Sequence, residues 1–459
     1  MLSGQRLRHL FLCEKRVNCD RSEGKQDGAF HLGIGSIRRK TVLKSIPLSR
    51  VRRLDLPPHE VAARFADAPG AVFFDSSLER PESISIVAAW PREIVTGKSP
   101  RDWETLRQKV RAAQTAAVMD DGAPRGMAAG YVSYDGSFRF GFYDDMLVYR
   151  HADQSWFETG SLVDRTPPQV ARRGRRLDFV PQVSRTQFCE MVRRAQEYIT
   201  AGDIYQVNLA HRFVADGLHD AWCFYETLRE CSPAPYSVFL HAEERTILSA
   251  SPERFLQISG SLIRTQPIKG TRPRHRDAAA DAKSAWDLVT SAKETAELIM
   301  ITDLERSDLG QICEFGSVQA RDLLKLERFE QVFHLVSTID GQLRSDVDHV
   351  TALQRCFPGG SVTGAPKKRA REIIRELEPD SRGIYTGAIG YFGFNGESQF
   401  NVAIRTVIVE NDVGRADSRN GLAHFHVGAG IVADSDPERE YHETLDKAEG
   451  ILLAAQRLG

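Results

Sequence analysis

The stretch between residues 384 and 434 decides the fold. It contains three apolar runs, "IYTGAIGYFGFN" (384–395), "FNVAIRTVIVE" (400–410) and "AHFHVGAGIVAD" (423–434), and a segment of helical character, "DPEREYHETLDKAEGILLAAQRL" (436–458), follows them. Each run is rich in β-branched and aromatic residues and ends at turn residues, which is typical of strands. Strands that follow one another without an intervening helix favour antiparallel pairing.

The same grouping extends towards the N-terminus. The β segments of "PYSVFLHAEERTILSASPERFLQISGSLIRTQPIKG" (235–270) lie between a helix at 184–200, closed by Gly202, and one helical segment at 281–309, "DAKSAWDLVTSAKETAELIMITDLERSDL". Another helix is expected at 365–379, "APKKRAREIIRELEP". Groups of strands separated by long helices predict an α+β fold with large antiparallel sheets.

Three regions are expected along the chain. Residues 1–50 carry eleven Lys and Arg residues against four acidic ones and show no apolar periodicity, so they predict a basic, disordered extension. Ordered structure is expected to begin near residue 51. A Pro-rich, basic crossing at 154–176 then separates an N-terminal region, 51–175, from a second region, 180–455.

Bulk composition excludes several classes of protein. The net charge is -1, so no global field attracts the chain to nucleic acid or to a membrane surface. No run of eighteen apolar residues appears, which argues against a spanning helix. The seven cysteines are scattered and form no CxxC pair, as expected of free thiols in a reducing, cytoplasmic setting.

Two pairs of glutamates could share one site. Glu294 and Glu297 lie three residues apart on one predicted helix, and Glu440 and Glu443 on another, with Lys447 one turn further on. If these faces are opposed, the four carboxylates would hold a divalent cation such as Mg²⁺, which prefers oxygen ligands. The alternative is two ordinary solvated helix faces.

Three further features could bind or act on a ligand. Arg405 interrupts an apolar strand, where it needs either a structural ion pair or a ligand carboxylate. His334 lies on a mostly apolar run, where a satisfied core histidine is the alternative to a catalyst. The turn "GSVTGAPKKR" (360–369) runs into a helix and could bind an anion, although a plain turn and helix cap is the favoured alternative.

Lys269, in "TQPIKGTRPR" (265–274), is either an exposed loop charge or a nucleophile. To attack carbon it must be neutral, which requires burial or a neighbouring cation. Glu253, in "SPERF", lies sixteen residues earlier, so a hairpin would bring a proton donor to the same place.

Taken together, these stretches resemble the chorismate-binding enzymes. The resemblance is strong over 180–455 and weaker over 51–175, and it rests on segments that occur in this order: "AGDIYQVNLAHRF", "SASPERF", "QPIKGTRPR", "ITDLERSDLGQI", "FHLVSTIDGQL", "CFPGGSVTGAPKKRAREIIRELEP", "RGIYTGAIGYF", "NVAIRTVIV" and "GAGIVADSDPEREYHETLDKAEGIL". It implies the fold of anthranilate synthase component I, in which large antiparallel sheets pack face to face with helices outside.

The resemblance also assigns roles to residues. It implies Mg²⁺ held by Glu297 and Glu443, with Glu294 and Glu440 in the surrounding acidic shell. It implies substrate binding by Gly270, Thr271, Thr363, Tyr385, Arg405, Gly428, Ala429, Gly430 and Lys447, and catalysis by Lys269, Glu253 and His334. A structural tryptophan pocket formed by Ser76, Pro235, Tyr236 and Ser237 is also expected from the segments "FFDSS" and "PAPYS".

Two positions indicate a branch of the family. Gln206 stands where isochorismate and salicylate synthases have a lysine that activates water. "PIKGT" stands where anthranilate synthases typically read Pro-Ile-Ala-Gly-Thr, and its lysine, Lys269, is typical of aminodeoxychorismate synthase component I. The expected reaction therefore converts chorismate and ammonia to 4-amino-4-deoxychorismate, a precursor of 4-aminobenzoate and folate. Anthranilate synthase component I and a catalytically silent chorismate-binding subunit are the alternatives.

The ammonia source is expected to be a partner. A class I glutaminase needs a cysteine in a Gly-x-Cys-x-Gly context, and none of the seven cysteines has one. The chain is therefore expected to take ammonia from a separate glutamine amidotransferase subunit, or to use free ammonia.

Overall fold

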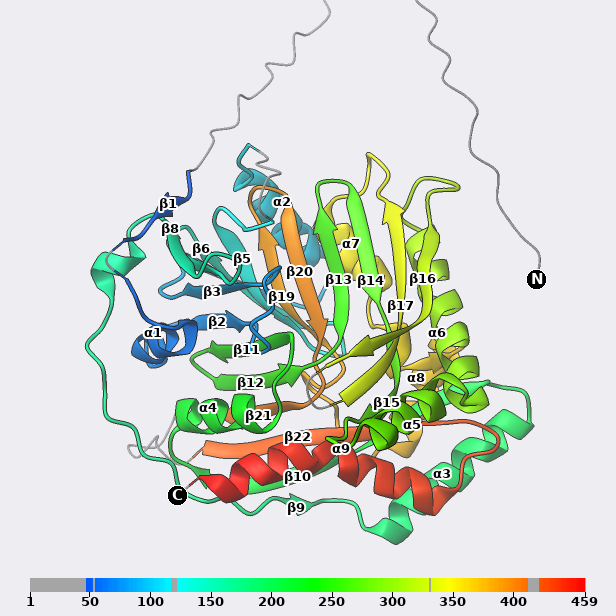
Figure 1. Ribbon diagram of the computed structural model, residues 1–459. Helices are drawn as coiled ribbons and strands as arrows, with labels where there is room; N and C mark the ends of the chain where they lie inside the picture. Colours follow the sequence, from blue (N-terminus) through cyan, green and yellow to red (C-terminus); the bar gives the residue numbers. More distant parts are fainter. Residues whose placement is uncertain (1–46, 53, 117–121, 330–331, 412–420, 459) are drawn as a thin grey trace, which may run out of the picture. The chain divides into compact units, whose positions relative to one another are not determined.

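Two antiparallel sheets form the body of the protein. The computed structural model describes residues 47–52, 54–116, 122–329, 332–411 and 421–458, so almost all of the predicted basic extension lies outside the described residues. The 12-stranded first sheet has the order β1-β8-β7-β3-β2-β11-β12-β21-β22-β10-β18, with β9 beside β10. The 10-stranded second sheet has the order β15-β17-β14-β13-β20-β19-β5-β6-β4, with β16 also beside β17 (Figure 1).

The strands of the first sheet are β1 Ser49–Arg50, β2 Val72–Asp75, β3 Ile84–Ala88, β7 Met146–Arg150, β8 Ser155–Thr159, β9 Val180–Pro181, β10 Gln206–Leu218, β11 Tyr236–His241, β12 Arg245–Ser251, β18 Gly364–Ala365, β21 Thr406–Glu410 and β22 Gly421–Ile431. Those of the second are β4 Glu93–Gly97, β5 Met127–Val132, β6 Phe138–Tyr143, β13 Arg254–Ser259, β14 Leu262–Gln266, β15 Ile268–Pro273, β16 Gln319–Arg328, β17 Val332–Gln342, β19 Ala388–Gly393 and β20 Glu397–Val402.

The helices in the described part of the chain are α1 Pro58–Phe65, α2 Pro100–Ala112, α3 Arg185–Thr200, α4 Ala221–Cys231, α5 Ala278–Val289, α6 Ala292–Gly310, α7 His349–Cys356, α8 Lys367–Leu377 and α9 Pro437–Arg457. Short 3-10 helices occur at Leu162–Arg165 and Gly360–Val362. None of these helices is long and apolar enough to cross a membrane.

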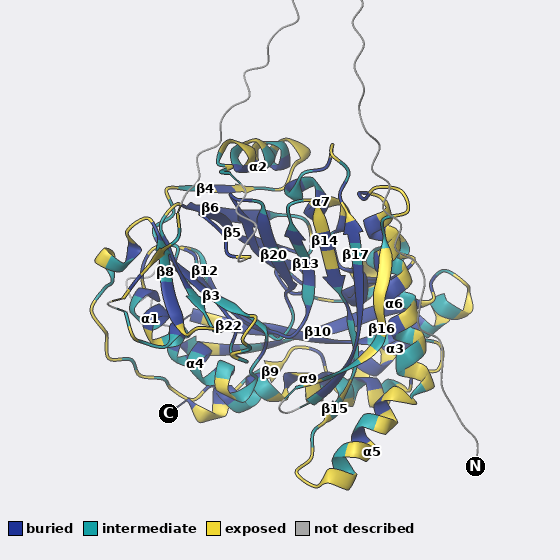
Figure 2. Cartoon of the chain, turned by 45° about the horizontal axis from the view of Figure 1, so that its top comes forward, coloured by how far each residue is buried: buried dark blue, intermediate teal, exposed yellow. Residues whose placement is uncertain are grey.

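The sheets pack face to face, with the helices on the outside. One core cluster joins side chains of both sheets, among them Ile86 and Val148 of the first and Met127 and Tyr391 of the second. The outer face of the first sheet is covered by α1, α4 and α9, and α2 and α7 pack on the second sheet. The sheets are largely buried in Figure 2, while helix α5 and strand β16 expose many residues. The predicted fold class is therefore confirmed.

One predicted helix is in fact two. The segment expected to form a single helix over 281–309 is divided between α5 and α6. The hydroxyl of Ser291 accepts a hydrogen bond from the backbone N–H of Glu294 and so caps a new helix. The prediction was wrong because no Gly or Pro marks the break, and a serine in mid-segment is a weaker signal.

The regions on either side of residues 175–180 contribute strands to both sheets. In the first sheet β2 pairs with β11, and in the second β5 pairs with β19. The boundaries 51–175 and 180–455 remain a prediction about sequence regions.

Candidate active site

Lys269 lies on β15, and its side chain is half-buried. Its Nζ donates a hydrogen bond to the backbone carbonyl of Ser361 at 3.4 Å. It also lies beside β22, because a Cβ added to Gly430 would be 3.9 Å from the Lys269 Nζ. The structure thus places Lys269 among the other predicted site residues and not on an exposed loop.

Glu253 occupies the turn between β12 and β13 and is only 5% exposed. Burial raises the pKa of its carboxyl, while the Ser361 side chain and the positive charge of Lys269 act in the opposite direction. A carboxyl with a raised pKa keeps its proton closer to neutral pH and can act as a general acid. The structure therefore brings together the proton donor and the amine that the sequence suggested.

The four predicted metal-binding glutamates lie on two helices, Glu294 and Glu297 on α6 and Glu440 and Glu443 on α9. Lys293 Nζ joins the two helices, at 3.2 Å from Glu440 Oε1 and 3.9 Å from Glu297 Oε1. Two more cations contact the remaining acids: Arg272 Nη1 lies 3.4 Å from Glu294 Oε1, and Lys447 Nζ lies 2.8 Å from Glu443 Oε1.

The donor chemistry of this acidic shell fits Mg²⁺. Among the described residues, no three His, Cys, Asp or Glu side chains are grouped closely enough to hold a metal ion. However, Glu297 Oε1 and Glu440 Oε2 are buried and have no hydrogen-bond partner in the described part of the chain. Burial, together with the negative charges of Glu294 and Glu443, raises the pKa of Glu297. A divalent cation would satisfy these oxygens.

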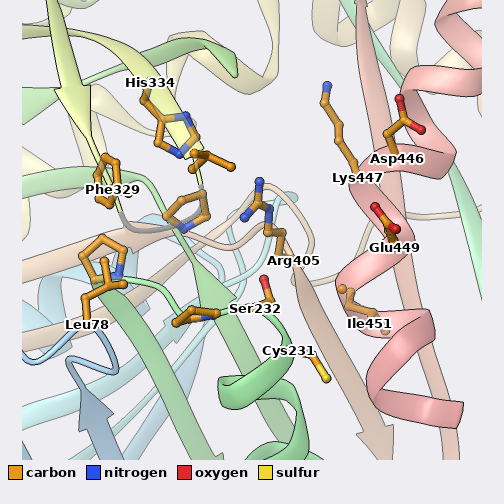
Figure 3. A pocket seen from close by; sticks show the side chains of 15 residues that line it. Leu78, Cys231, Ser232, Phe329, His334, Arg405, Asp446, Lys447, Glu449 and Ile451 are labelled. Atoms are coloured by element: carbon orange, nitrogen blue, oxygen red, sulfur yellow. The ribbon is translucent and has the colours of Figure 1, made fainter. Parts of the chain in front are cut away.

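The single strand predicted over 400–410 is divided into β20 of the second sheet and β21 of the first, and Arg405 lies between them with a left-handed backbone conformation, φ of 48°. Its guanidinium makes no hydrogen bond or ion pair with any described residue, and burial lowers its pKa. A pocket of about 160 Å³ is lined by Arg405, His334 and Lys447. Figure 3 shows Arg405 between His334 on one side and the α9 residues Lys447 and Glu449 on the other. An unpaired guanidinium beside this pocket is suited to a ligand carboxylate.

His334 is buried on β17, and its Nδ1 lies 3.0 Å from the hydroxyl of Thr271. Burial, assisted by the positive charge of Arg405, lowers the pKa of His334 to about 4. The imidazole is therefore neutral at pH 7, so it can hydrogen-bond a ligand but does not bring a charge to it.

The glycines predicted to bind the substrate allow neighbouring groups to lie close to the backbone. A Cβ on Gly430 would lie 2.5 Å from Gln206 Nε2, and one on Gly428 would lie 3.0 Å from the Tyr385 hydroxyl. Gly270 has φ of 70° and faces Glu294 Oε2. Ala429 is the buried residue between the two β22 glycines.

Two side chains predicted to bind the substrate donate hydrogen bonds to backbone carbonyls. Lys447 Nζ donates to the carbonyl of Gly428 at 2.9 Å. Thr363 donates its hydroxyl to the carbonyl of Gly359 at 3.0 Å. Thr363 therefore shapes the 359–363 turn, and its predicted contact with the substrate ring stays a prediction.

The residues expected to form a tryptophan pocket lie where β2 and β11 pair. Ser237 is opposite Asp75 in the ladder, and Ser76 follows directly, with a buried hydroxyl that has no partner among the described residues. Asp75 Oδ2 accepts from Arg229 Nε at 2.9 Å. Of the other two predicted residues, Pro235 lines the pocket of Figure 3, and Tyr236 begins β11. Tryptophan binding stays a prediction.

Sequence reasoning missed two residues of the site. Lys293, which bridges Glu297 and Glu440, could have been found, because it lies four residues before Glu297 on one helix face. Ser361, whose carbonyl accepts from Lys269, gave no signal, because backbone groups carry none in a sequence.

Comparison with known proteins agrees with this geometry. Residues 71–453 match the family described as chorismate binding enzyme. Aminodeoxychorismate synthase component 1 of Escherichia coli (strain K12) is 46% identical over 433 residues, covering 86% of this chain and 92% of the relative. Anthranilate synthase component 1 of Synechocystis is 42% identical over 290 residues, 62% of this chain and 56% of the relative.

A solved structure supports the same assignment. Anthranilate synthase component I from Streptococcus pneumoniae superposes with a TM-score of 0.71 at 29% identity, covering 81% of this chain and 93% of that one. The resemblance inferred from the motifs is thereby confirmed: the chain belongs to the family of chorismate-binding enzymes.

Proposed function

We propose that the protein is an aminodeoxychorismate synthase component I, which converts chorismate and ammonia to 4-amino-4-deoxychorismate for 4-aminobenzoate and folate synthesis. The observation that carries the proposal is the position of Lys269, beside Glu253 and Gly430 in a site of this family. The 46% identity with aminodeoxychorismate synthase component 1 of Escherichia coli supports it.

In the proposed first step, the lone pair of Lys269 Nζ forms a bond to C2 of chorismate, and the two conjugated ring double bonds shift, from C1–C2 to C1–C6 and from C5–C6 to C4–C5. The C4–oxygen bond breaks, and Glu253 donates its proton to the leaving hydroxyl, which departs as water. The buried position of Glu253 supports this role, because the raised pKa keeps the proton available.

In the second step, ammonia bonds to C4, both ring double bonds shift back, and the bond between C2 and Lys269 breaks. The Glu253 carboxylate then removes a proton from the new ammonium group, and both residues return to their starting states. Gln206 supports amination over hydration, because a neutral amide next to Gly430 cannot activate water as a lysine would.

The remaining residues would bind and orient chorismate. Arg405, with Tyr385 and the Gly428–Gly430 backbone, would hold one carboxylate. Glu297 and Glu443, with Glu294 and Glu440 around them, would hold Mg²⁺, which when bound supplies a positive charge for the other carboxylate. The ammonia would come from a separate glutamine amidotransferase subunit.

The product formed from chorismate, Mg²⁺ and an ammonium salt at mildly alkaline pH tests the proposal. We expect 4-amino-4-deoxychorismate, and in rapidly quenched samples a covalent adduct that mass spectrometry assigns to Lys269. Lys269→Ala should abolish both, while Lys283→Ala, a lysine on α5, should leave both unchanged.

Anthranilate as the product would instead identify an anthranilate synthase, which the 42% identical relative keeps as the second candidate. Failure to consume chorismate, even with a glutaminase partner added, would indicate a silent subunit. An adduct that persists in Lys269→Ala would exclude Lys269 as the nucleophile.

A further inference from the structure

A second carboxyl, Glu305, is buried behind the site and takes no part in the chemistry described so far. Glu305 is only 5% exposed and lies on α6, two turns beyond Glu297, on the helix face that packs against the second sheet. Its Oε2 accepts a hydrogen bond from the hydroxyl of Thr265 at 2.7 Å. Thr265, on β14, is itself buried.

Glu305 is next to the turn that supports Lys269. A Cβ added to Gly360 would lie 3.4 Å from the Glu305 Cγ, so this glycine lets the turn pack directly on the side chain. The following residue, Ser361, accepts the hydrogen bond from Lys269 with its carbonyl, and its side chain acts on Glu253. Glu305, the turn and the two proposed catalytic residues are therefore contiguous.

Three charged groups and one hydroxyl surround Glu305. Glu253 faces it from the β12–β13 turn, Asp308 from α6 and Lys367 from α8, with the Thr265 hydroxyl on β14. Lys367 forms an ion pair with Asp308, with 2.5 Å between Nζ and Oδ2. Burial, then the negative charge of Glu253, raises the pKa of Glu305 to about 8, and Asp308 adds to this rise.

Two carboxyls that share a buried region resist being charged together. A negative charge on Glu305 would oppose the negative charge that Glu253 acquires when it protonates the leaving hydroxyl. We propose that Glu305 is a positioning residue that acts through Glu253: it stays protonated and uncharged while Glu253 gives up its proton and takes it back. This inference rests on the proposed acid–base role of Glu253.

The inference predicts a loss of activity when Glu305 ionises. Above about pH 8 the rate of chorismate consumption should fall, measured at a fixed concentration of unprotonated ammonia so that the supply of nucleophile stays constant. Glu305→Gln is uncharged at every pH and still offers Thr265 an acceptor. In this variant the fall in rate above pH 8 should be absent, so activity is kept at higher pH.

Thr265→Val is a second variant that should change the pH at which the rate of chorismate consumption falls. The Thr265 hydrogen bond stabilises the charged form of Glu305. Without it, the pH at which the rate falls should be higher by about one pH unit. Asp303→Asn, which removes an exposed acid from the same helix, is the control and should leave the profile unchanged. A role confined to packing would not predict these shifts.

A measurement without substrate separates this inference from the proposed function. The infrared difference spectrum of the wild type minus Glu305→Gln, in which the bands of Glu253 and the other buried acids cancel, should contain the C=O band of one protonated carboxylic acid at pH 7. This band should be lost near pH 8 in the wild type and persist to higher pH in Thr265→Val. If this band is present but chorismate is not consumed, the proposed function fails and the protonation of Glu305 stands. A difference spectrum without the band at pH 7, or a fall in activity above pH 8 that is unchanged in Glu305→Gln, overturns the inference.

Discussion

Two arginines near the site, the buried Arg382 and the partly buried Arg405, have opposite surroundings. Arg382 pairs with Glu378, with 2.6 Å between Nη2 and Oε1 and side-chain exposures of 1% and 4%, and it also donates to the backbone carbonyls of Val362 and Asn208. Arg405 has no comparable partner among the described residues. Arg382 therefore serves the fold, and Arg405 has its guanidinium available for a ligand.

Substitution by methionine should separate these roles. Arg382→Met leaves the Glu378 carboxyl buried without its partner, so we expect a loss of roughly 3–5 kcal/mol in the free energy of unfolding. Arg405→Met removes a charge that no described residue compensates, so stability should be unchanged or higher. Its KM for chorismate should rise roughly ten- to a hundredfold, because a charge-assisted hydrogen bond is lost.

Urea unfolding and steady-state kinetics of both variants measure these effects. If Arg405→Met unfolds as easily as Arg382→Met, Arg405 is part of a structural ion pair and is not a ligand-binding group.

At this scale the sequence was informative wherever a residue type was out of place. Arg405, in a predicted apolar strand, needed either an ion pair or a ligand carboxylate. The role of Lys269 was predicted only by the resemblance to the family, because a lysine beside a glycine is by itself an ordinary loop residue. Glu305 was not predicted, because an acid on a helix is ordinary until the structure shows that its face is buried against Thr265.

Strand β22 brings its Gly-Ala-Gly segment against the start of β10. Asn208 pairs with Gly430 and Ala210 with Gly428, and Gln206 lies beside Gly430. The sequence predicted the strand and the bare backbone. It could not predict the neighbour, because β10 and β22 are far apart in the chain and their register depends on packing.

Alanine at Gly430 should disturb function more than folding. The added Cβ would come within 2.5 Å of Gln206 Nε2, the end of a flexible side chain, and within 3.9 Å of Lys269 Nζ, so Gln206 must shift next to the proposed nucleophile. We expect kcat/KM to fall at least about tenfold, which corresponds to about 1.4 kcal/mol of transition-state stabilisation. The melting temperature should change little.

Gly310→Ala provides the matched control. Gly310 is the last residue of α6, and nothing lies within 4 Å of a Cβ added there. Alanine should raise stability by up to about 1 kcal/mol and leave kcat/KM unchanged. Full activity in Gly430→Ala would mean that the Gln206 side chain does not border the reacting groups.

The whole molecule depends on pairings between distant segments. Strand β2 pairs with β11 and β12 pairs with β21, each across about 160 residues of sequence. Local periodicity predicted that these strands exist and that the sheets are antiparallel. It could not give their order, since several strands of similar length and composition could occupy each place.

The stability of the whole molecule should fall in acid through its buried histidines. His211, on β10, is 2% exposed, and its Nε2 lies 2.8 Å from the Thr444 hydroxyl on α9. Burial lowers the pKa of His211 to about 4. Between pH 6.5 and 4 the unfolded chain therefore binds a proton that the folded protein does not, so stability is lost as the pH falls through this range.

Comparison with His211→Gln isolates this contribution. Burial raises the pKa of Glu253 and Glu297, and these acids oppose the trend because they favour the folded state as the pH falls. The difference in the free energy of unfolding between wild type and variant cancels them. Urea unfolding should show this difference shrinking by roughly 2 kcal/mol between pH 7 and 4.5. A difference that does not depend on pH would mean that His211 binds its proton equally well in the folded and the unfolded chain, and that the contact between β10 and α9 tolerates a charge.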